Sequence, residues 1–216
     1  MECKYNINSH KVYNFIMPVI NSNMYVILGD KQALIIDPFM CIEATTLLDE
    51  NGIKRLTIML THEHYDHISG VNYYRDLFEC EVIGSSKTAA LVQDATKNLA
   101  AFYMAMFINR TEEEIEITRK YLDDKYTCSI DGTFEGEYQV EFEDLTMKLV
   151  ETLGHSMGSI CISIEDRYVF TGDSLVQGAK IVTRLPGGNK SLYKEITKPY
   201  LEAFPKDAII YPGHGE

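Results

Sequence analysis

The stretch LTIMLTHEHYDH, residues 56–67, places an uninterrupted apolar run directly before a dense group of histidine and acidic side chains. Its first five residues have the length and composition of a strand that is buried on both faces. The part that follows contains His62, His64, Asp66 and His67, and so holds three of the chain's six histidines. The stretch therefore predicts a buried strand whose carboxyl end presents metal-ligating side chains.

The spacing within this cluster restricts which metals it suits. In an extended chain, residues two apart point to the same side, so His62 and His64 are expected to face one position. A turn into helical geometry would let His64 and His67 converge, because they are three residues apart. Imidazole nitrogens with the carboxylate of Asp66 suit zinc, iron, manganese or nickel. The zinc-protease motif H-E-x-x-H is absent, because the fourth residue after His62 is Asp66.

Three further candidate ligands follow glycine in turns that are predicted at strand ends. They are His155 in TLGHSMGS, Asp173 in FTGDS and His214 in YPGHGE. Glycine lets the backbone bend tightly, so these side chains can share one space with the cluster. The cluster alone cannot complete two metal coordination spheres, whereas seven residues can. His10 is the one histidine outside this set and is expected to be an ordinary surface or packing residue.

Short β-branched and aromatic stretches, separated by Asn, Gly, Asp and Pro, predict strands on both sides of the cluster. They are residues 12–20, 23–29, 32–38, 56–60 and 81–84, then 138–142, 145–153, 159–165, 167–173 and the closing AIIYPGHGE. Helices are expected at 41–50, with a C-cap at Asn51-Gly52, at 70–78 and at about 190–203. This order favours one α/β (α+β) domain over residues 1–216, with two sheets packed face to face and helices outside.

Residues 86–125 differ in character and are predicted to form a helical insertion. KTAALVQDATKNLAAFYMAMF has helical composition, and a capping box of Thr111 and Glu114 opens a second helix. Five large side chains fall within six positions, too many for one stripe of a solvent-facing helix: Phe102, Tyr103, Met104, Met106 and Phe107. Two interpretations stay open, namely buried core or a homodimer interface, and an apolar lid or wall of a substrate pocket.

Composition indicates a cytoplasmic globular protein. The chain has 216 residues, 45% of them hydrophobic and 24% charged, and five cysteines without a C-x-x-C pair, which fits free thiols in a reducing compartment. The net charge of −12 and the lack of a Lys/Arg run disfavour a nucleic-acid partner. No apolar leader opens the chain. The longest uncharged apolar run, residues 100–108, is far shorter than the ~20 residues that span a membrane.

These motifs resemble the metallo-β-lactamase fold superfamily, in its glyoxalase II-like branch. The resemblance rests on LIIDP (34–38), THEHYDH (61–67), TLGHSMGS (152–159), FTGDS (170–174) and YPGHGE (211–216), which stand in the family's order. It covers essentially the whole chain. It implies an αββα sandwich of two mixed sheets, with the metals in the cleft at one edge of the sheets.

Carried over residue by residue, the resemblance implies two divalent metal ions, most simply Zn²⁺, with iron or manganese as alternatives. One ion would be held by His62, His64 and His155, and the other by Asp66, His67 and His214. Asp173 would bridge both ions, together with a hydroxide that acts as the nucleophile. Asp66 is the candidate catalytic residue, and Asp37 would support the site from outside or cap it.

Two departures from the family pattern bear on the substrate. Met157 stands where many relatives have proline, which affects loop stiffness more than chemistry. The chain ends at Glu216, just after His214, so the C-terminal helical domain with which glyoxalase II holds glutathione is not expected. Lys180 and Arg184 either aim a cation at an anionic substrate group or are solvated loop charges.

The expected function is a dinuclear metal-dependent hydrolase that cleaves an ester, thioester or lactone-type bond of a small, anionic or acylated molecule. Asp173 favours this reaction over antibiotic hydrolysis, since dedicated β-lactamases of the fold have cysteine or no protein ligand there. Three alternatives stay open on the same scaffold: a mononuclear iron dioxygenase that acts on persulfides, a phosphodiesterase, and a non-enzymatic binding or sensing protein. The sequence names neither the substrate nor the physiological metal.

Overall fold

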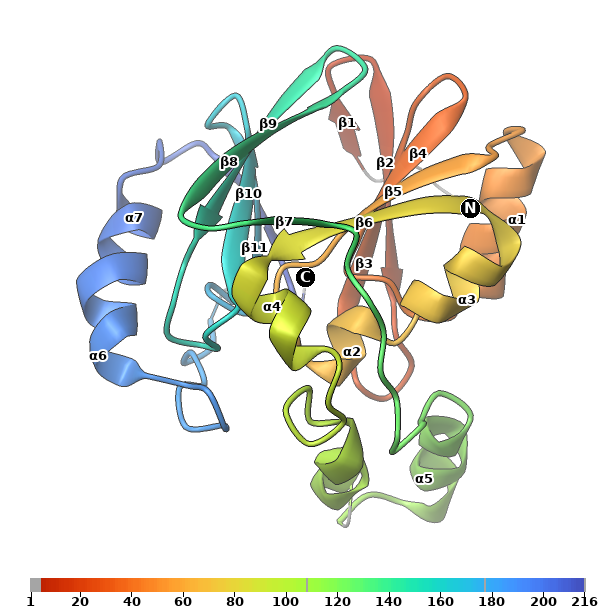
Figure 1. Ribbon diagram of the computed structural model, residues 1–216, viewed down its shortest axis with the longest axis vertical. Coiled ribbons are helices and arrows are strands. Elements are labelled where there is room, and N and C mark those ends of the chain that lie inside the picture. The colour runs from red at the N-terminus through yellow and green to blue at the C-terminus, as the bar shows by residue number, and fades with distance from the viewer. Residues whose placement is uncertain (1–4, 108, 177, 216) are drawn as a thin grey trace.

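The computed structural model describes residues 5–107, 109–176 and 178–215, without the side chain of Met106. Two β-sheets pack face to face, and helices cover both outer faces (Figure 1). One sheet has seven strands in sequential order: β1 (Tyr5–Ile7), β2 (His10–Ile16), β3 (Asn23–Leu28), β4 (Gln32–Ile36), β5 (Arg55–Met59), β6 (Glu79–Ser85) and β7 (Gly132–Phe134). The other has five, in the order β12 (Ile209–Pro212), β11 (Tyr168–Gly172), β10 (Ile160–Ile164), β9 (Leu145–Glu151) and β8 (Glu137–Phe142).

The seven-stranded sheet is buried on both faces, which explains its nearly continuous apolar strands. Along β3, Met24 and Val26 pack under the helices, whereas Tyr25 and Ile27 face the second sheet. The strand pairs β4–β5, β5–β6 and β6–β7 are parallel, and so is β11–β12. Because the carboxyl ends of parallel neighbours meet at one edge, residues that follow β4, β5, β11 and β12 are brought close together.

Helices α1 (Ile42–Glu50), α2 (Tyr65–Ile68) and α3 (Val71–Leu77) belong to the seven-stranded side of the molecule, and α6 (Lys190–Leu192) and α7 (Lys198–Glu202) lie outside the five-stranded sheet (Figure 1). The helix predicted at 190–203 is therefore present, but it widens into a π-helical turn over Tyr193–Thr197. Pro199, which lacks an N–H donor, stands at the start of α7 and interrupts the regular α-helical ladder there.

The insertion is helical only in part. It comprises α4 (Ser86–Leu91), a 3₁₀ helix over Ala100–Phe107 and α5 (Glu112–Arg119). Figure 1 shows α5 below the sheets, whereas α4 lies next to β7. The segment of helical composition in its first half is divided into α4 and the 3₁₀ helix. The Asp94 side chain accepts hydrogen bonds from the backbone N–H and the hydroxyl of Thr96 and so favours a turn between them. The capping box of Thr111 and Glu114 is confirmed.

Two short edge strands, β1 and β7, were not predicted, since three residues give no readable period. The first predicted strand is shorter than expected, as the chain turns after Ile16 and Met17 hydrogen-bonds across the turn to Ser22. Among the described residues, no helix has the length and apolar character that a membrane span requires. The four described cysteines, Cys41, Cys80, Cys128 and Cys161, are free thiols.

Candidate metal centre

All seven candidate ligands lie together at one edge of the two sheets. Cluster 62–67 follows β5, Asp173 follows β11, His214 follows β12, and His155 stands in the turn after β9. Gly213 is required there, since a Cβ atom at this position would overlap the Asp173 carboxylate and approach His67. The tight turns that glycine permits thus let side chains from four distant segments meet.

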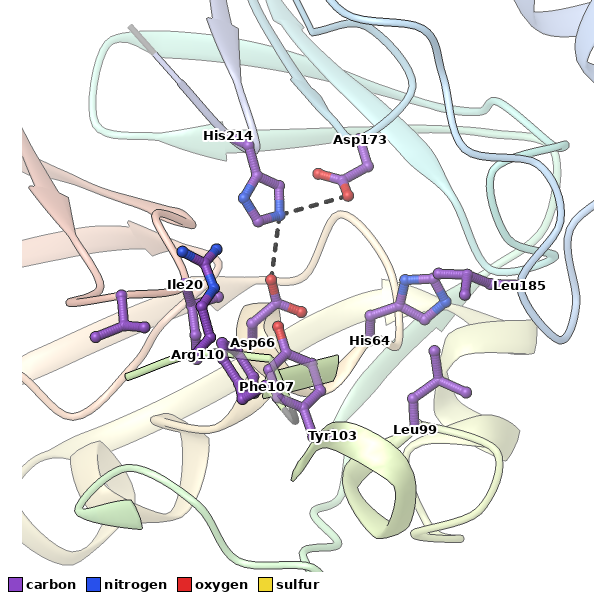
Figure 2. Close-up of a pocket in the computed structure, with 11 residues that line it drawn as sticks. Ile20, His64, Asp66, Leu99, Tyr103, Phe107, Arg110, Asp173, Leu185 and His214 are labelled. Carbon is purple, nitrogen blue, oxygen red and sulfur yellow. Dashed lines mark ion pairs between the residues drawn. The ribbon is translucent and has the colours of Figure 1, made fainter. Parts of the chain in front are cut away.

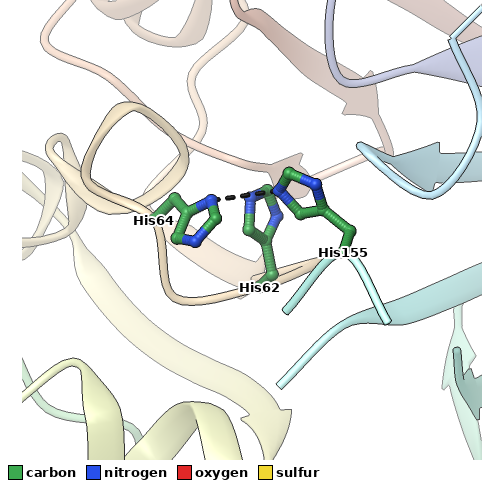
Figure 3. Close-up of side chains that lie close together, drawn as sticks. All are labelled: His62, His64 and His155. Carbon is green, nitrogen blue, oxygen red and sulfur yellow. Dashed lines mark hydrogen bonds between the residues drawn. The ribbon is translucent and has the colours of Figure 1, made fainter. Parts of the chain in front are cut away.

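The first group, called the histidine group below, comprises His62, His64 and His155 (Figure 3). One side-chain nitrogen from each lies within 4.8 Å of the others. His64 Nδ1 and His155 Nε2 are 3.0 Å apart. His64 has an extended backbone, and α2 begins only after it. The His64 side chain therefore belongs to the group of His62 rather than to that of His67.

The second group, called the mixed group below, comprises Asp66, His67 and His214. His214 Nε2 lies 3.1 Å from Asp66 Oδ2 and 3.3 Å from His67 Nε2. The Asp173 carboxylate stands between the two groups. Its Oδ2 is 3.4 Å from His155 Nε2 and 3.5 Å from His214 Nε2, the second of these contacts being drawn in Figure 2.

Protein acceptors orient four of the five imidazole rings through Nδ1. His155 Nδ1 bonds to the carbonyl of Val182 at 2.8 Å, and His214 Nδ1 bonds to that of Asn21 at 3.2 Å. His67 Nδ1 donates to Asp37 Oδ2 at 2.9 Å. With Nδ1 committed to these acceptors, Nε2 of each ring faces the centre, which is the arrangement that metal-ligating histidines adopt.

Asp37 supports the centre through Thr61, a residue that the sequence did not single out. The backbone N–H of Thr61 donates to Asp37 at 2.7 Å and its hydroxyl at 2.6 Å, and the same hydroxyl oxygen lies 3.0 Å from His62 Nδ1. Asp37 therefore orients His62 indirectly and His67 directly. Its carboxylate could also join these two rings as a third metal-binding group, but its oxygens are already occupied by Thr61 and His67.

Burial keeps the histidine group neutral. It lowers the pKa of His62 well below the usual value, with the neighbouring rings of His67 and His64 adding to the effect. Burial likewise lowers the pKa of His64 to about 3, and that of His155. Neutral imidazole is the form that binds a metal ion.

The mixed group is ionised instead. Burial alone would lower the pKa of His67, but Asp66, Asp173 and Asp37 outweigh it and raise that pKa well above its usual value. The pKa of His214 is raised in the same way, against burial, by Asp66 and Asp173. Burial would raise the pKa of Asp66, yet His67 and His214 hold it well below its usual value.

The donor set fits metal ions. Within the part of the chain that the structure describes, His62 Nε2, His64 Nε2 and Asp173 Oδ1 are buried atoms without a hydrogen-bond partner. Buried polar atoms are almost always paired, so unpaired nitrogen and oxygen atoms beside a ring of further donors indicate a site that suits a cation. Nitrogen and carboxylate ligands of this kind suit zinc, iron or manganese.

A pocket of about 250 Å³ opens onto the centre (Figure 2). His64, Asp66, Asp173 and His214 form one wall, and the insertion supplies Leu99, Tyr103, Phe107 and Arg110; Val19, Ile20 and Leu185 complete the lining. Tyr103 is buried beside the Asp66 carboxylate, and burial together with that charge raises the pKa of its hydroxyl well above the usual value. The insertion thus contributes side chains to the space above the candidate ligands.

The aromatic run of the insertion divides into two faces. Tyr103 and Phe107 are buried, belong to the core under the seven-stranded sheet and line the pocket. Phe102 and Met104 are 54% and 36% exposed and do not line it. The expectation that Met104 would border a substrate is therefore not supported by the geometry, and the side chain of Met106 lies outside the described part.

Arg110 and Glu63 belong to the site region but were not singled out from the sequence. Lys180 and Arg184, the cations that the sequence suggested, are exposed and absent from the pocket lining, whereas Arg110 lines it. Glu63 is buried and accepts a hydrogen bond from the Ser156 hydroxyl at 2.8 Å, beside His155. Burial raises the pKa of Glu63. This contact joins segments that are far apart in the sequence, so the residues next to Glu63 do not reveal it.

Sequence comparison finds a family model, described as the metallo-beta-lactamase superfamily, that matches residues 17–214. The chain is 29% identical to the "Probable metallo-hydrolase YqgX" of Bacillus subtilis over 203 residues, 92% of this chain and 88% of the relative. It is 27% identical to the "Probable metallo-hydrolase MJ0888" of Methanocaldococcus jannaschii, over 91% of this chain and 88% of that one.

Structure comparison agrees with the fold described above. The crystal structure of the BLEG-1 B3 metallo-beta-lactamase aligns with a TM-score of 0.76 at 28% identity, covering 95% of this chain and 92% of that chain. A di-iron-bound form of TTHA1623 aligns with a TM-score of 0.71 at 21% identity, covering 94% of this chain and 92% of the other. At that identity, the second likeness speaks only for the fold.

Proposed function

This chain belongs to the metallo-β-lactamase superfamily, and on that premise we propose that it is a dinuclear metal-dependent hydrolase acting on a small molecule. The bond cleaved is an ester, thioester or lactone-type bond. The observation that carries the proposal is the pair of ligand groups on either side of Asp173, with unpaired buried donor atoms in the space between them. The names of the curated relatives, probable metallo-hydrolases, support the same reaction class.

In this proposal His62, His64 and His155 hold one ion, Asp66, His67 and His214 hold the other, and Asp173 contacts both. Two divalent cations at such a site lower the pKa of water towards ~7 and polarise the scissile carbonyl. Zinc is the first choice, with iron or manganese as alternatives for the same donors.

The protein's own residues position the reaction. The Nδ1 bonds to Val182, Asn21, Asp37 and Thr61 fix the ligand rings before a substrate arrives. Tyr103 lines the pocket together with Asp66. Phe107 and Leu99 line the approach with apolar surface, which excludes water and favours an acyl chain.

The direct test is quantification of metal in the purified protein, followed by assays on thioesters, lactones, phosphodiesters and β-lactams. We expect two ions per chain, thioester, ester or lactone cleavage that a chelator abolishes, and loss of activity in Asp66→Ala. One iron per chain with oxygen uptake on a persulfide would favour the dioxygenase. Full activity in the chelated protein would refute the proposal.

The acyl pocket is tested with a matched pair of variants in the insertion. Phe107→Ala enlarges the pocket wall and should raise KM for longer acyl chains more than for acetyl. Met104→Ala removes an apolar side chain three residues away that lies outside the lining, and should leave the chain-length preference unchanged. Equal effects of the two variants on all substrates would contradict the pocket.

A further inference from the structure

Arg110 is the one Lys or Arg side chain among the residues that line the pocket above the candidate ligands, within the described ranges. We infer that it selects the substrate: the molecule cleaved carries a second, anionic group, a carboxylate or phosphate, in addition to the scissile bond. This inference rests on the proposed function and names the substrate class of that same site.

The pocket combines three kinds of lining. His64, Asp66, Asp173 and His214 bring the candidate ligands to it, and apolar side chains line it as well, namely those of Leu99, Phe107, Val19, Ile20 and Leu185. In Figure 2 the Arg110 guanidinium stands beside Ile20, on the same side of the view as His214 and across from His64, Leu99 and Leu185. A substrate that fills this space would meet metal ligands, apolar surface and a guanidinium.

The local chain holds Arg110 over the pocket. Its backbone N–H donates to the carbonyl of Phe107 at 2.9 Å, which turns the chain after the 3₁₀ helix and keeps residues 107 and 110 on one side. Arg110 Nη1 donates to Glu114 Oε1 at 3.1 Å, while Glu114 Oε2 accepts from the backbone and hydroxyl of Thr111. The capping box that opens α5 thus anchors the partner that orients the guanidinium.

This anchoring leaves donors free for a ligand. A guanidinium has five N–H donors in a fixed fork, and one contact to Glu114 uses only part of them. An exposed ion pair of this kind contributes little stability. The ion pair with Glu114 instead orients the guanidinium, whose fork of donors matches a carboxylate or a phosphate. The net charge of the protein, −12, would otherwise repel anions.

A matched control lies in the same insertion. Arg119 is also exposed and pairs with a glutamate of its own helix, Glu116, but it does not line the pocket. Arg110→Gln and Arg119→Gln therefore remove the same charge and the same kind of ion pair. Only Arg110→Gln removes a charge that a bound substrate can reach.

The experiment compares thioesters that differ only by one charge. In the first arm, pentanoyl and glutaryl thioesters of one neutral thiol place the anion on the acyl half. In the second, pentanoyl thioesters of 3-mercaptopropionate and of its amide place it on the leaving half. We expect the wild type to prefer the anionic member in one arm, and Arg110→Gln to lower kcat/KM for that member about tenfold. Arg110→Lys should retain part of the preference, Arg119→Gln all of it, and added salt should weaken it.

A binding measurement separates this inference from the proposed hydrolysis. Calorimetry on the metal-loaded protein should show glutarate binding more tightly than pentanoate in the wild type and in Arg119→Gln, with the difference lost in Arg110→Gln. Failure to hydrolyse any thioester would count against the proposed function and leave this binding result standing. Equal binding of the two acids by the wild type, or the same change in both arginine variants, would overturn the role of Arg110.

Discussion

The two ligand groups of the candidate centre lie side by side and have opposite electrostatics. In the histidine group, burial lowers the pKa of His62, His64 and His155, so the three rings are neutral near pH 7. In the mixed group, neighbouring carboxylates raise the pKa of His67 and His214. One group is therefore three neutral donors, and the other is an ion-paired network.

This difference means that the histidines of the two groups differ in protonation state before a metal ion binds. Neutral buried imidazoles bind a metal ion without giving up a proton. Protonated imidazoles must lose theirs, so metal binding is coupled to proton release. In the mixed group His67 and His214 pair with Asp66 and Asp173, and a cation would take the place of those protons.

Removing the residue shared by both groups should have the largest effect. Asp173→Ala takes away the carboxylate that lies between His155 and His214. We expect both ions to bind weakly and kcat/KM to fall about a thousandfold, which corresponds to about 4 kcal/mol of transition-state stabilisation. Elemental analysis and a thioester assay measure this, with the exposed Asp207→Ala as control. Unchanged metal content in Asp173→Ala would show that it belongs to neither group.

The pH dependence of metal uptake should tell the two groups apart. Since His67 and His214 have raised pKa values, their neutral forms become dominant only as the pH rises through those values. Binding of one ion should thus weaken as the pH falls, by about tenfold per pH unit for each proton displaced, while the other ion is retained. Calorimetry in buffers of different ionisation enthalpy counts the protons. Identical pH dependence for both ions would contradict the electrostatic difference.

Two buried carboxyl groups support the two ligand groups unequally, since Asp37 contacts His67 directly and His62 only through Thr61. Asp37→Asn removes the charge that His67 Nδ1 donates to, and should weaken the ion of the mixed group about 10-fold to 100-fold. Glu63→Gln alters the contact to Ser156, next to His155, and should weaken the other ion less, because one hydroxyl bond is affected and the Val182 bond to His155 remains. Competition with a chromogenic chelator measures both. A larger effect of Glu63→Gln than of Asp37→Asn would show that the contacts of these two residues do not support the ligand groups as described.

The residues that the structure brings together in the candidate centre could be singled out from the sequence, because residue type and spacing indicate metal-binding chemistry locally. His62 to His67 follow a continuous apolar strand, and His155, Asp173 and His214 each follow a glycine, so each could be recognised within its own segment. The parallel strand order then brings these segments to one edge of the sheets. The division into two sheets with outer helices followed from the same strand and helix periods.

Features that depend on contacts between distant segments were not predictable in this way. Arg110 stands in a turn after the aromatic run. Its neighbours in the sequence do not reveal that it lines the pocket, whereas Arg119 does not line it. The division of the run into buried Tyr103 and Phe107 and exposed Met104 is set by the core that they meet. The break at Asp94 comes from a side chain that competes with helical hydrogen bonds.

The smallest effect is expected far from the centre, at the one histidine outside both groups. His10, the first residue of β2, is buried. Its Nε2 lies 2.6 Å from Oδ1 of Asp144, which stands in the turn after β8. Burial would lower its pKa, but Asp144, the Leu28 carbonyl and Glu143 raise it above the usual value. A raised pKa in the folded state means that charged His10 stabilises the fold fully below ~6.5, the pKa of an unfolded histidine. This contribution is lost as the pH rises through the folded value.

His10→Gln should therefore reduce the free energy of unfolding more at pH 6 than at pH 9, as measured by urea titrations with chelator present. The exposed Lys11→Gln is the control and should show no such difference. If His10→Gln costs the same at both pH values, the charge of His10 does not stabilise the fold and its raised pKa is contradicted.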